Sequence, residues 1–342
     1  MNTPDRLYPE QAWVRRPPEA TGLDAEKLAA VGQSLAENAN GQPYRVIIIR
    51  HGYLTAEWSG DVAPEEQLPL ASAAKSLYGT MLGIAIAEGM IRSADDRVVD
   101  YYPEMMDVPE GYGPKPGRFA REKDRAITFR GLISNTSGYM KPGEEPGKVF
   151  HYQTFGMNIL CHAIATRYGY YDSHDPERLP GFGRLVEEKI RDPIGGTWTW
   201  GYTNFELPPQ ARIAIFGNYN QIYVTAHDMA RMGWLWLHRG RWQGEQIVPK
   251  AWMREATQTA PGIRANCPEG QWEYGYGFWT NDHLQLWPSL PCDSFAALGA
   301  GNKRIWCCPR LDLVVAQSPG LFPSEDESFE NLLRLVVEAC GP

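Results

Sequence analysis

Apolar residues recur along the chain with two different periods, which predict helices and strands in separate regions. Residues 23–39 carry apolar side chains three or four positions apart, the spacing of an amphipathic helix. Residues 44–50 form a β-branched run, and a second strand over 53–58 follows a short His-Gly turn. The N-terminal part therefore predicts a helix and a β-hairpin, preceded by an extended, proline-bearing arm over residues 1–22.

The strand pattern returns near the C-terminus. Apolar runs predict further strands at residues 274–279, 295–298, 304–308 and 311–317. The last two are joined as a hairpin, and a capping box from Ser324 to Glu327 predicts a terminal helix that reaches about Cys340. Strands at both ends of the chain predict one antiparallel sheet built from both termini and flanked by the terminal helices.

Helical patterns fill the middle of the chain. Residues 72–88 are apolar on nearly every face of the predicted helix, which is typical of a helix buried on all sides. Short helices alternate with Pro/Gly loops over residues 95–219, and a helix over 225–238 opens with a Thr-x-x-Asp capping box. We therefore expect a large, mostly helical insertion between the two halves of the sheet.

The length of the chain agrees with this division. A chain of 342 residues, at roughly 150 per domain, favours two domains. We expect an α/β (α+β) protein with a sheet domain over residues 1–70 and 265–342 and a mostly helical domain over 71–264. The apolar helix then lies at the interface between the two domains.

Composition narrows the classes of partner. The 41 acidic and 33 basic residues give a net charge of −8 without any basic block, so neither nucleic acid nor a membrane is an expected partner. The N-terminus has no apolar secretory segment, and no run approaches the ~18 apolar residues of a spanning helix. The six cysteines and seven histidines show no metal-ligand spacing. We expect a cytoplasmic protein with reduced thiols, no metal and no cofactor.

The first candidate for chemistry is Ser72-Ala-Ala-Lys75, the only S-x-x-K sequence in the chain. Residues three apart on a helix share a face, so the hydroxyl lies beside the ammonium. A serine at the first turn is also an ordinary N-cap, but the partner that completes a capping box is Glu or Gln, and lysine has no acceptor. Burial favours the neutral amine, which can accept the serine proton. We therefore favour Ser72 as a nucleophile and Lys75 as its base.

The proportion of lysine to arginine supports the assignment of Lys75 as the base. Nine of the 33 basic residues are lysines, and the arginines cannot lose a proton at neutral pH. The other eight lysines are expected in loops, at helix ends or on exposed faces.

These residues make the chain resemble the serine β-lactamase and penicillin-binding-protein superfamily. It is most similar to the class C β-lactamase-type esterases and the 6-aminohexanoate-dimer hydrolases. The matching blocks lie at residues 71–76, 95–103, 127–138, 225–233 and 242–244. The resemblance extends from about residue 24 to residue 320 and implies a β-lactamase/transpeptidase-like fold.

The resemblance also assigns the second motif, Tyr-x-Asn, to Tyr152-Gln-Thr154. It implies that Tyr152 shuttles a proton among Ser72, Lys75 and the leaving group, although an ordinary core tyrosine is the alternative. Thr154 stands where the family has Asn and has no amide to hold a substrate carbonyl. This departure argues against β-lactam or peptidoglycan binding more than against the Ser/Lys/Tyr centre.

The third motif, Lys-Thr-Gly or His-x-Gly, is best matched by the segment around Gly299-Ala300-Gly301. No cation precedes the glycine, and Lys303 and Arg304 fall too late in the sequence, so the carboxylate-binding cation of penicillin recognition is missing. The resemblance implies that the backbone N–H groups of Ser72 and Ala300 form the oxyanion hole. A glycine-rich turn without a catalytic part is the alternative.

Other residues are weaker candidates for substrate binding. His151 lies next to Tyr152 and is either a site residue or part of the wall. Trp200 and Tyr276 belong to aromatic stripes that either line an apolar pocket or form plain core.

The expected function is hydrolysis of a small-molecule ester or amide through an acyl-enzyme on Ser72. Two alternatives remain open: a β-lactamase or D-amino-acid peptidase, and a non-catalytic member of the fold that binds a ligand. The sequence leaves the acyl and leaving groups and the oligomeric state undetermined.

Overall fold

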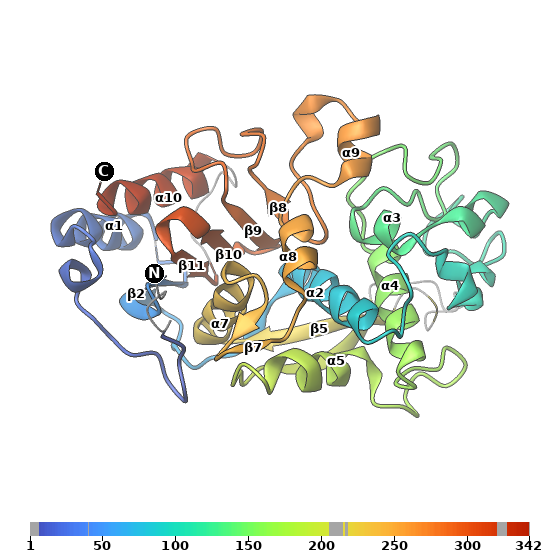
Figure 1. Cartoon of the computed structure of the whole chain (residues 1–342), viewed down its shortest axis with the longest axis horizontal. Coiled ribbons are helices and arrows are strands. Elements are labelled where there is room, and N and C mark those ends of the chain that lie inside the picture. Colours follow the sequence, from blue (N-terminus) through green and yellow to red (C-terminus); the bar gives the residue numbers. More distant parts are fainter. Residues whose placement is uncertain (1–6, 40, 205–214, 216–217, 320–326, 342) are drawn as a thin grey trace.

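The computed structural model describes residues 7–39, 41–204, 215, 218–319 and 327–341 (Figure 1). Its helices are α1 (Ala25–Asn38), α2 (Ala74–Ala87), α3 (Phe129–Ile133), α4 (Phe155–Arg167), α5 (Gly181–Val186), α7 (Ala226–Leu237), α8 (Lys250–Ala256), α9 (Pro261–Asn266) and α10 (Glu327–Ala339). Its strands are β1 (Tyr44–Arg50), β2 (Tyr53–Gly60), β3 (Leu68–Pro69), β4 (Thr199–Asn204), β5 (Asn218–Val224), β6 (Arg241–Trp242), β7 (Glu245–Gln246), β8 (Trp279–Thr280), β9 (Phe295–Gly299), β10 (Lys303–Cys308) and β11 (Leu313–Gln317).

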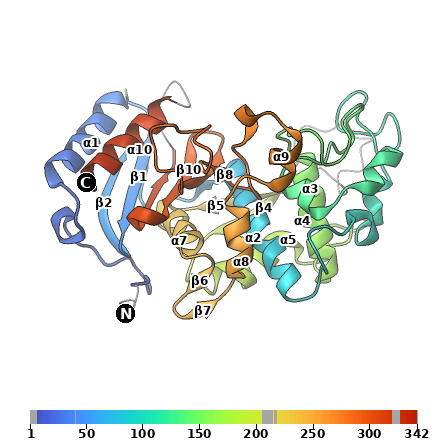
Figure 2. The same cartoon turned by 45° about the horizontal axis from the view of Figure 1, so that its top comes forward.

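Six antiparallel strands form the main sheet in the order β2-β1-β11-β10-β9-β8. The N-terminal hairpin pairs directly with the C-terminal strands, so that Ile48 lies opposite Val315. Helices α1 and α10 pack together over one face, and α7 packs against β1, β10 and β11 on the other (Figure 2). The predicted fold, a sheet built from both termini and flanked by the terminal helices, is confirmed.

Alternation along β1 explains why this strand is apolar throughout. Val46 and Ile48 enter the core beneath α1 and α10, whereas Ile47 and Ile49 enter the larger core that contains α7 and α2. Because successive side chains of a strand point to opposite faces, a strand that is covered on both faces needs a continuous apolar run.

Two predicted elements differ in extent. The strand expected over 274–279 is reduced to β8, because Tyr274 meets Trp279 in a single bridge and the chain turns between them at Gly277, whose φ is +83°. The last sheet strand starts at Leu313 because a 3-10 turn occupies Pro309–Leu311. The capping-box residues 324–326 lie outside the described residues.

A second sheet, β3-β5-β4, corrects the expectation of helices and loops over 95–219. Trp200 and Tyr202 lie two positions apart along β4 and share one face of it, which is the period of a strand. Strand β3 joins this sheet immediately before α2, and the N–H of Leu70 donates to the carbonyl of Ile222 at 2.7 Å. The second sheet therefore fixes the point at which the chain enters the predicted catalytic helix.

Helix α2 is buried from Ala74 to Ala85, as predicted, and contacts β9, α3, α4 and α8. A Cβ at Gly79 would lie 2.1 Å from the carbonyl oxygen of Tyr276, so this close approach requires glycine. The indole of Trp252 donates to the Gly79 carbonyl at 2.8 Å. The helix is thus held on all sides, and its first turn is fixed relative to the sheet.

Candidate active site

The chain reaches Ser72 through an uncommon backbone conformation. Ala71 has φ +52°, in the left-handed region that non-glycine residues rarely adopt. Ser72 follows in the short 3-10 helix Ala71–Ala73, and its side chain caps neither this turn nor α2. Strain of this kind persists where the surrounding structure enforces it and is frequent at functional sites. The sequence carries no signal for it, because alanine is not a turn residue.

Lys75 lies beside the hydroxyl of Ser72. Its Nζ donates to Ser72 Oγ at 2.7 Å, and the lysine is only 1% exposed. Burial lowers the pKa of Lys75 to about 7, and the nearby Cys161 opposes this shift only in part. Near neutral pH a large fraction of the amine is therefore neutral and able to accept a proton.

Tyr152 completes the group on the other side of Ser72. Its hydroxyl is hydrogen-bonded with Ser72, and its ring centroid lies 4.8 Å from Lys75 Nζ. Tyr274 meets the ring edge-on and Trp279 lies against it, with centroids 5.8 and 5.4 Å away. Burial raises the pKa of Tyr152 to about 12, so the side chain is a phenol, and not a phenolate, at neutral pH.

Asn135 holds the segment that carries Tyr152. Its backbone carbonyl accepts from His151 N–H at 2.9 Å, and its side-chain Oδ1 accepts from Gln153 N–H at 3.0 Å. Asn135 has φ +57°, a conformation that asparagine tolerates better than most residues. Because Asn135 binds the residues on both sides of Tyr152, it fixes the direction of the phenol. Sequence analysis missed this role.

The end of β9 lies against the backbone of the nucleophile. A Cβ at Gly299 would lie 2.5 Å from the Leu70 carbonyl oxygen and 3.3 Å from Ser72 N. Ala300 is exposed directly after Gly299, and Gly301 turns the chain with φ +71°. The close approach explains the glycine at 299. It places the predicted third-motif segment beside Ser72.

Lys303 returns to this edge through the hairpin. It pairs with Gly299 in the β9–β10 ladder, and burial lowers the pKa of its half-buried amine. Along the chain, Lys303 falls too late to be the cation of the third motif. Pairing across the strands nevertheless places its backbone opposite the glycine.

Comparison with known proteins identifies the family. Residues 33–323 match the family model described as Beta-lactamase. The chain belongs to the beta-lactamase family. It is 25% identical to the 6-aminohexanoate-dimer hydrolase of Paenarthrobacter ureafaciens over 357 residues, which cover 91% of this chain and 82% of that protein.

Solved structures with low sequence identity share the fold of this chain. A penicillin-binding protein homologue from Caulobacter crescentus superposes with a TM-score of 0.66 at 17% identity, covering 93% of this chain and 98% of that one. EstCE1, a hydrolase with promiscuous acyltransferase activity, superposes with a TM-score of 0.63 at 14% identity, covering 94% and 99%. Homologues of this beta-lactamase-family chain are thus hydrolases.

Two residues predicted to bind substrate lie elsewhere in this beta-lactamase-family chain. Tyr276 is fully buried, and its hydroxyl donates to Glu255 at 2.6 Å beside Arg130, so it stabilises the packing of α8 and cannot line a pocket. Trp200 packs against α5, where a Cβ at Gly183 would fall 2.0 Å from the indole. The sequence left both residues as either pocket lining or plain core, because an aromatic stripe looks the same in either place.

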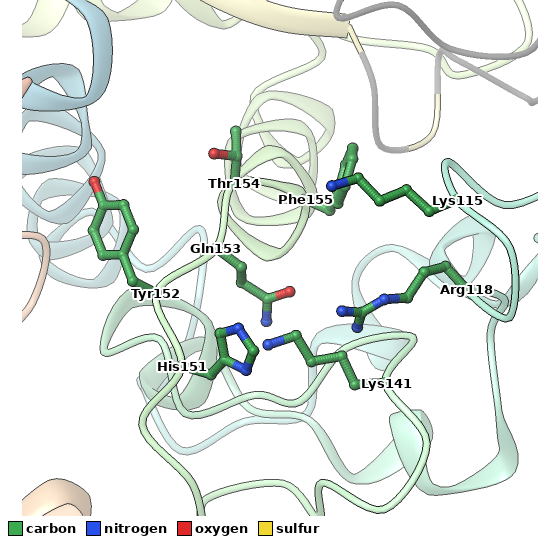
Figure 3. Close-up of a pocket in the computed structure, with 8 residues that line it drawn as sticks. All are labelled: Lys115, Arg118, Lys141, His151, Tyr152, Gln153, Thr154 and Phe155. Atoms are coloured by element: carbon green, nitrogen blue, oxygen red, sulfur yellow. The ribbon is translucent and has the colours of Figure 1, made fainter. Parts of the chain in front are cut away.

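His151 and Thr154, in contrast, line a pocket of about 430 Å³ beside Tyr152 (Figure 3). The exposed His151 has its Nδ1 2.9 Å from Glu144 Oε1. Thr154 precedes α4 at the N-cap position, but its side chain makes no capping bond. The other lining residues are Lys115, Arg118, Lys141, Gln153 and Phe155.

Sequence analysis missed the three cations of this pocket. Lys141 lies in a loop, as expected of the remaining lysines, but it is 3% exposed and not on the surface. Lys115 and Arg118 come from a separate loop more than twenty positions earlier. No local pattern connects these residues, because only the tertiary fold brings them together.

Two further findings concern the residues described by the structure. Among them, no three His, Cys, Asp or Glu side chains gather as ligands for a metal ion. None of the described helices combines the length and the apolar character needed to cross a membrane.

Proposed function

We propose that this chain is a serine hydrolase that cleaves a small-molecule ester or amide through an acyl-enzyme on Ser72. The observation that carries the proposal is the 2.7 Å contact between Lys75 Nζ and Ser72 Oγ at a site where burial lowers the lysine pKa to about 7. A nucleophile needs an adjacent base whose pKa lies near the working pH, and this pair supplies both.

In the proposed reaction, neutral Lys75 accepts the proton of Ser72 as Oγ attacks the substrate carbonyl. The N–H groups of Ser72 and Ala300 stabilise the negative oxygen of the tetrahedral intermediate. The Tyr152 phenol donates its proton to the leaving group as the intermediate collapses, and it regains a proton from Lys75. Water then attacks the acyl-enzyme by the reverse sequence, which releases the acid and restores Ser72.

The substrate class follows from the motifs that are altered and from the relatives. Thr154 replaces the amide of the second motif, and residue 297 is alanine where penicillin-recognising members carry a cation. The dimer hydrolase and EstCE1 are relatives with hydrolytic activity. These observations favour an ester or amide hydrolase over a β-lactamase or D-amino-acid peptidase.

The test is turnover of 4-nitrophenyl acetate by the wild-type chain and the Ser72→Ala variant, both checked for folding by circular dichroism. We expect hydrolysis above background in the wild type and a loss on the order of 10⁴-fold or more in the variant. Equal rates would favour a non-catalytic, ligand-binding role. Nitrocefin and D-alanyl peptides, assayed in parallel, would reveal β-lactamase or peptidase activity if they were cleaved faster than the ester.

A further inference from the structure

The pocket shown in Figure 3 adjoins the predicted catalytic centre, and Tyr152 belongs to both. Tyr152 lines the pocket, and its hydroxyl forms a hydrogen bond with Ser72. Gln153 and Thr154 continue the wall away from Tyr152 to the start of α4. The pocket therefore borders the predicted catalytic centre along the Tyr152 segment.

Positive charge dominates the pocket. Figure 3 shows the terminal nitrogens of Arg118 and Lys141 near the Gln153 amide and that of Lys115 beside Phe155. Among the described residues, the side chains of Lys115 and Arg118 make no ion pair or hydrogen bond.

One carboxylate, that of Glu144, balances part of this charge. Its Oε2 lies 3.3 Å from Lys141 Nζ, and its Oε1 lies 2.9 Å from the His151 ring. Among the described residues, one carboxylate against three cations leaves two positive charges without a partner carboxylate in the pocket. Unpaired cations that converge on one cavity are the usual arrangement for binding an anion.

Lys141 is a buried residue of the pocket wall and not a surface side chain that extends into the pocket. It follows Met140, whose φ of +57° is unusual for its residue type and whose N–H donates to buried Asp124 at 3.2 Å. Burial lowers the pKa of Lys141 to about 8, with Arg118 and Lys123 adding to the decrease and Glu144 opposing it. An ammonium has three donors, and one carboxylate does not satisfy them all.

We propose that this pocket binds an anionic group of the substrate, so that the enzyme prefers esters or amides that carry a carboxylate or phosphate away from the scissile bond. Lys141 and Arg118 bind the anion directly, and Lys115 contributes from the exposed rim. The preference for anionic substrates rests on the proposed hydrolase function. Binding of the anion to the pocket does not depend on that function.

Matched pairs of esters test the preference. 4-Nitrophenyl hydrogen adipate and suberate are compared with their methyl esters, which differ by one charge on the acyl side. 4-Acetoxybenzoate and its methyl ester differ by one charge on the leaving group. Inorganic phosphate is added as a competitor to test whether the pocket binds phosphate. We expect kcat/KM for the anionic member of at least one pair to exceed that of the neutral member by about tenfold or more.

Three pocket variants and one control assign the effect. Lys141→Met, Arg118→Gln and Lys115→Gln should each lower the anionic-to-neutral ratio, with the exposed Lys115 giving the smallest change. The Arg118 and Lys115 variants keep the test valid if loss of the buried Lys141 prevents folding. Lys250→Gln, at an exposed position outside the pocket, should leave the ratio unchanged. A ratio that stays within about twofold in all pocket variants would overturn the proposal.

A binding measurement separates this proposal from the hydrolase function. Adipate and phosphate are titrated calorimetrically into the Ser72→Ala variant, with and without Arg118→Gln. Binding that weakens about tenfold in the double variant supports the anion pocket even if no ester is cleaved. Ester turnover without any binding of either anion, and with equal rates on both members of each pair, would leave the hydrolase standing and contradict the pocket.

Discussion

Lys75 and Lys141 are both buried lysines with a lowered pKa, but their surroundings differ. Lys75 lies beside one hydroxyl and one aromatic ring: its amine contacts Ser72 Oγ and lies over the ring of Tyr152. Lys141 has the carboxylate of Glu144 at 3.3 Å and faces an open pocket. Burial lowers the pKa of both amines, to about 7 for Lys75 and to about 8 for Lys141, and Glu144 opposes the decrease at Lys141.

The comparison separates two uses of a buried lysine. A lysine beside hydroxyls, with no carboxylate among the groups that shift its pKa, becomes a base near neutral pH. A lysine that retains a carboxylate stays mostly protonated and can attract an anion. Under the functions proposed above, the first acts on Ser72 and the second positions the substrate.

The largest expected effect is the loss of the base. Lys75→Arg keeps a cation in place but cannot accept a proton, so kcat/KM on a neutral ester should fall about 10³-fold or more, as it should in Lys75→Met. Lys250→Arg is the matched control, because Lys250 is exposed. Substantial activity in the arginine variant would show that the lysine serves only as a fixed charge.

Removal of the phenol should have the next largest effect. Tyr152→Phe keeps the ring against Tyr274 and Trp279 but removes the proton donor, so we expect kcat/KM to fall about 10²-fold. Burst kinetics on 4-nitrophenyl esters would show whether acylation is the step that slows. A variant with wild-type kcat/KM would return Tyr152 to the role of an ordinary core tyrosine.

The two lysines should also give opposite pH dependences. Protonated Lys75 cannot accept a proton, so kcat/KM on a neutral ester should fall about tenfold per pH unit below about pH 6 and level off above about pH 8. The anionic-to-neutral ratio should instead fall as Lys141 loses its proton above about pH 8, while Arg118 stays charged.

Other charged or ionisable groups also lie around Lys141. They are Glu144, which is hydrogen-bonded to His151, and the lysines Lys123 and Lys115. Profiles that rise or fall together for the neutral ester and for the ratio would contradict the separate roles of the two lysines.

The smallest expected effect is that of salt. The Debye length falls from about 10 Å at 0.1 M to about 3 Å at 1 M, which screens the half-open pocket more than the buried Ser72–Lys75 contact. The anionic-to-neutral ratio should decrease about threefold over this range of NaCl, measured with the wild-type chain. A ratio that salt does not change would argue against recognition by charge.

Much of the fold could be predicted because the relevant patterns are local. The apolar run of β1 and the all-round apolar surface of α2 specify a strand and a helix that are each covered on every side. The β4–β5 pairing was not predicted because Trp200 was considered for its aromatic chemistry and not for its strand spacing from Tyr202.

The site likewise contains residues that a local pattern brings together and residues that only the tertiary fold brings together. Ser72 and Lys75 are three positions apart on one helical turn, so the sequence alone brings them together. The Tyr152 prediction needed the resemblance to a family, because its position depends on Asn135, far away in sequence. The pocket of Lys115, Arg118 and Lys141 arises from two loops that no periodicity connects.

The measurement that tests the central claim most directly is labelling with a fluorophosphonate, followed by mass spectrometry of the digested protein. The account predicts one adduct per chain on the peptide that contains Ser72, no adduct in Ser72→Ala, and slower labelling as the pH falls below about 7 and Lys75 becomes protonated. A folded protein that remains unlabelled, or that is labelled at another residue, would contradict it.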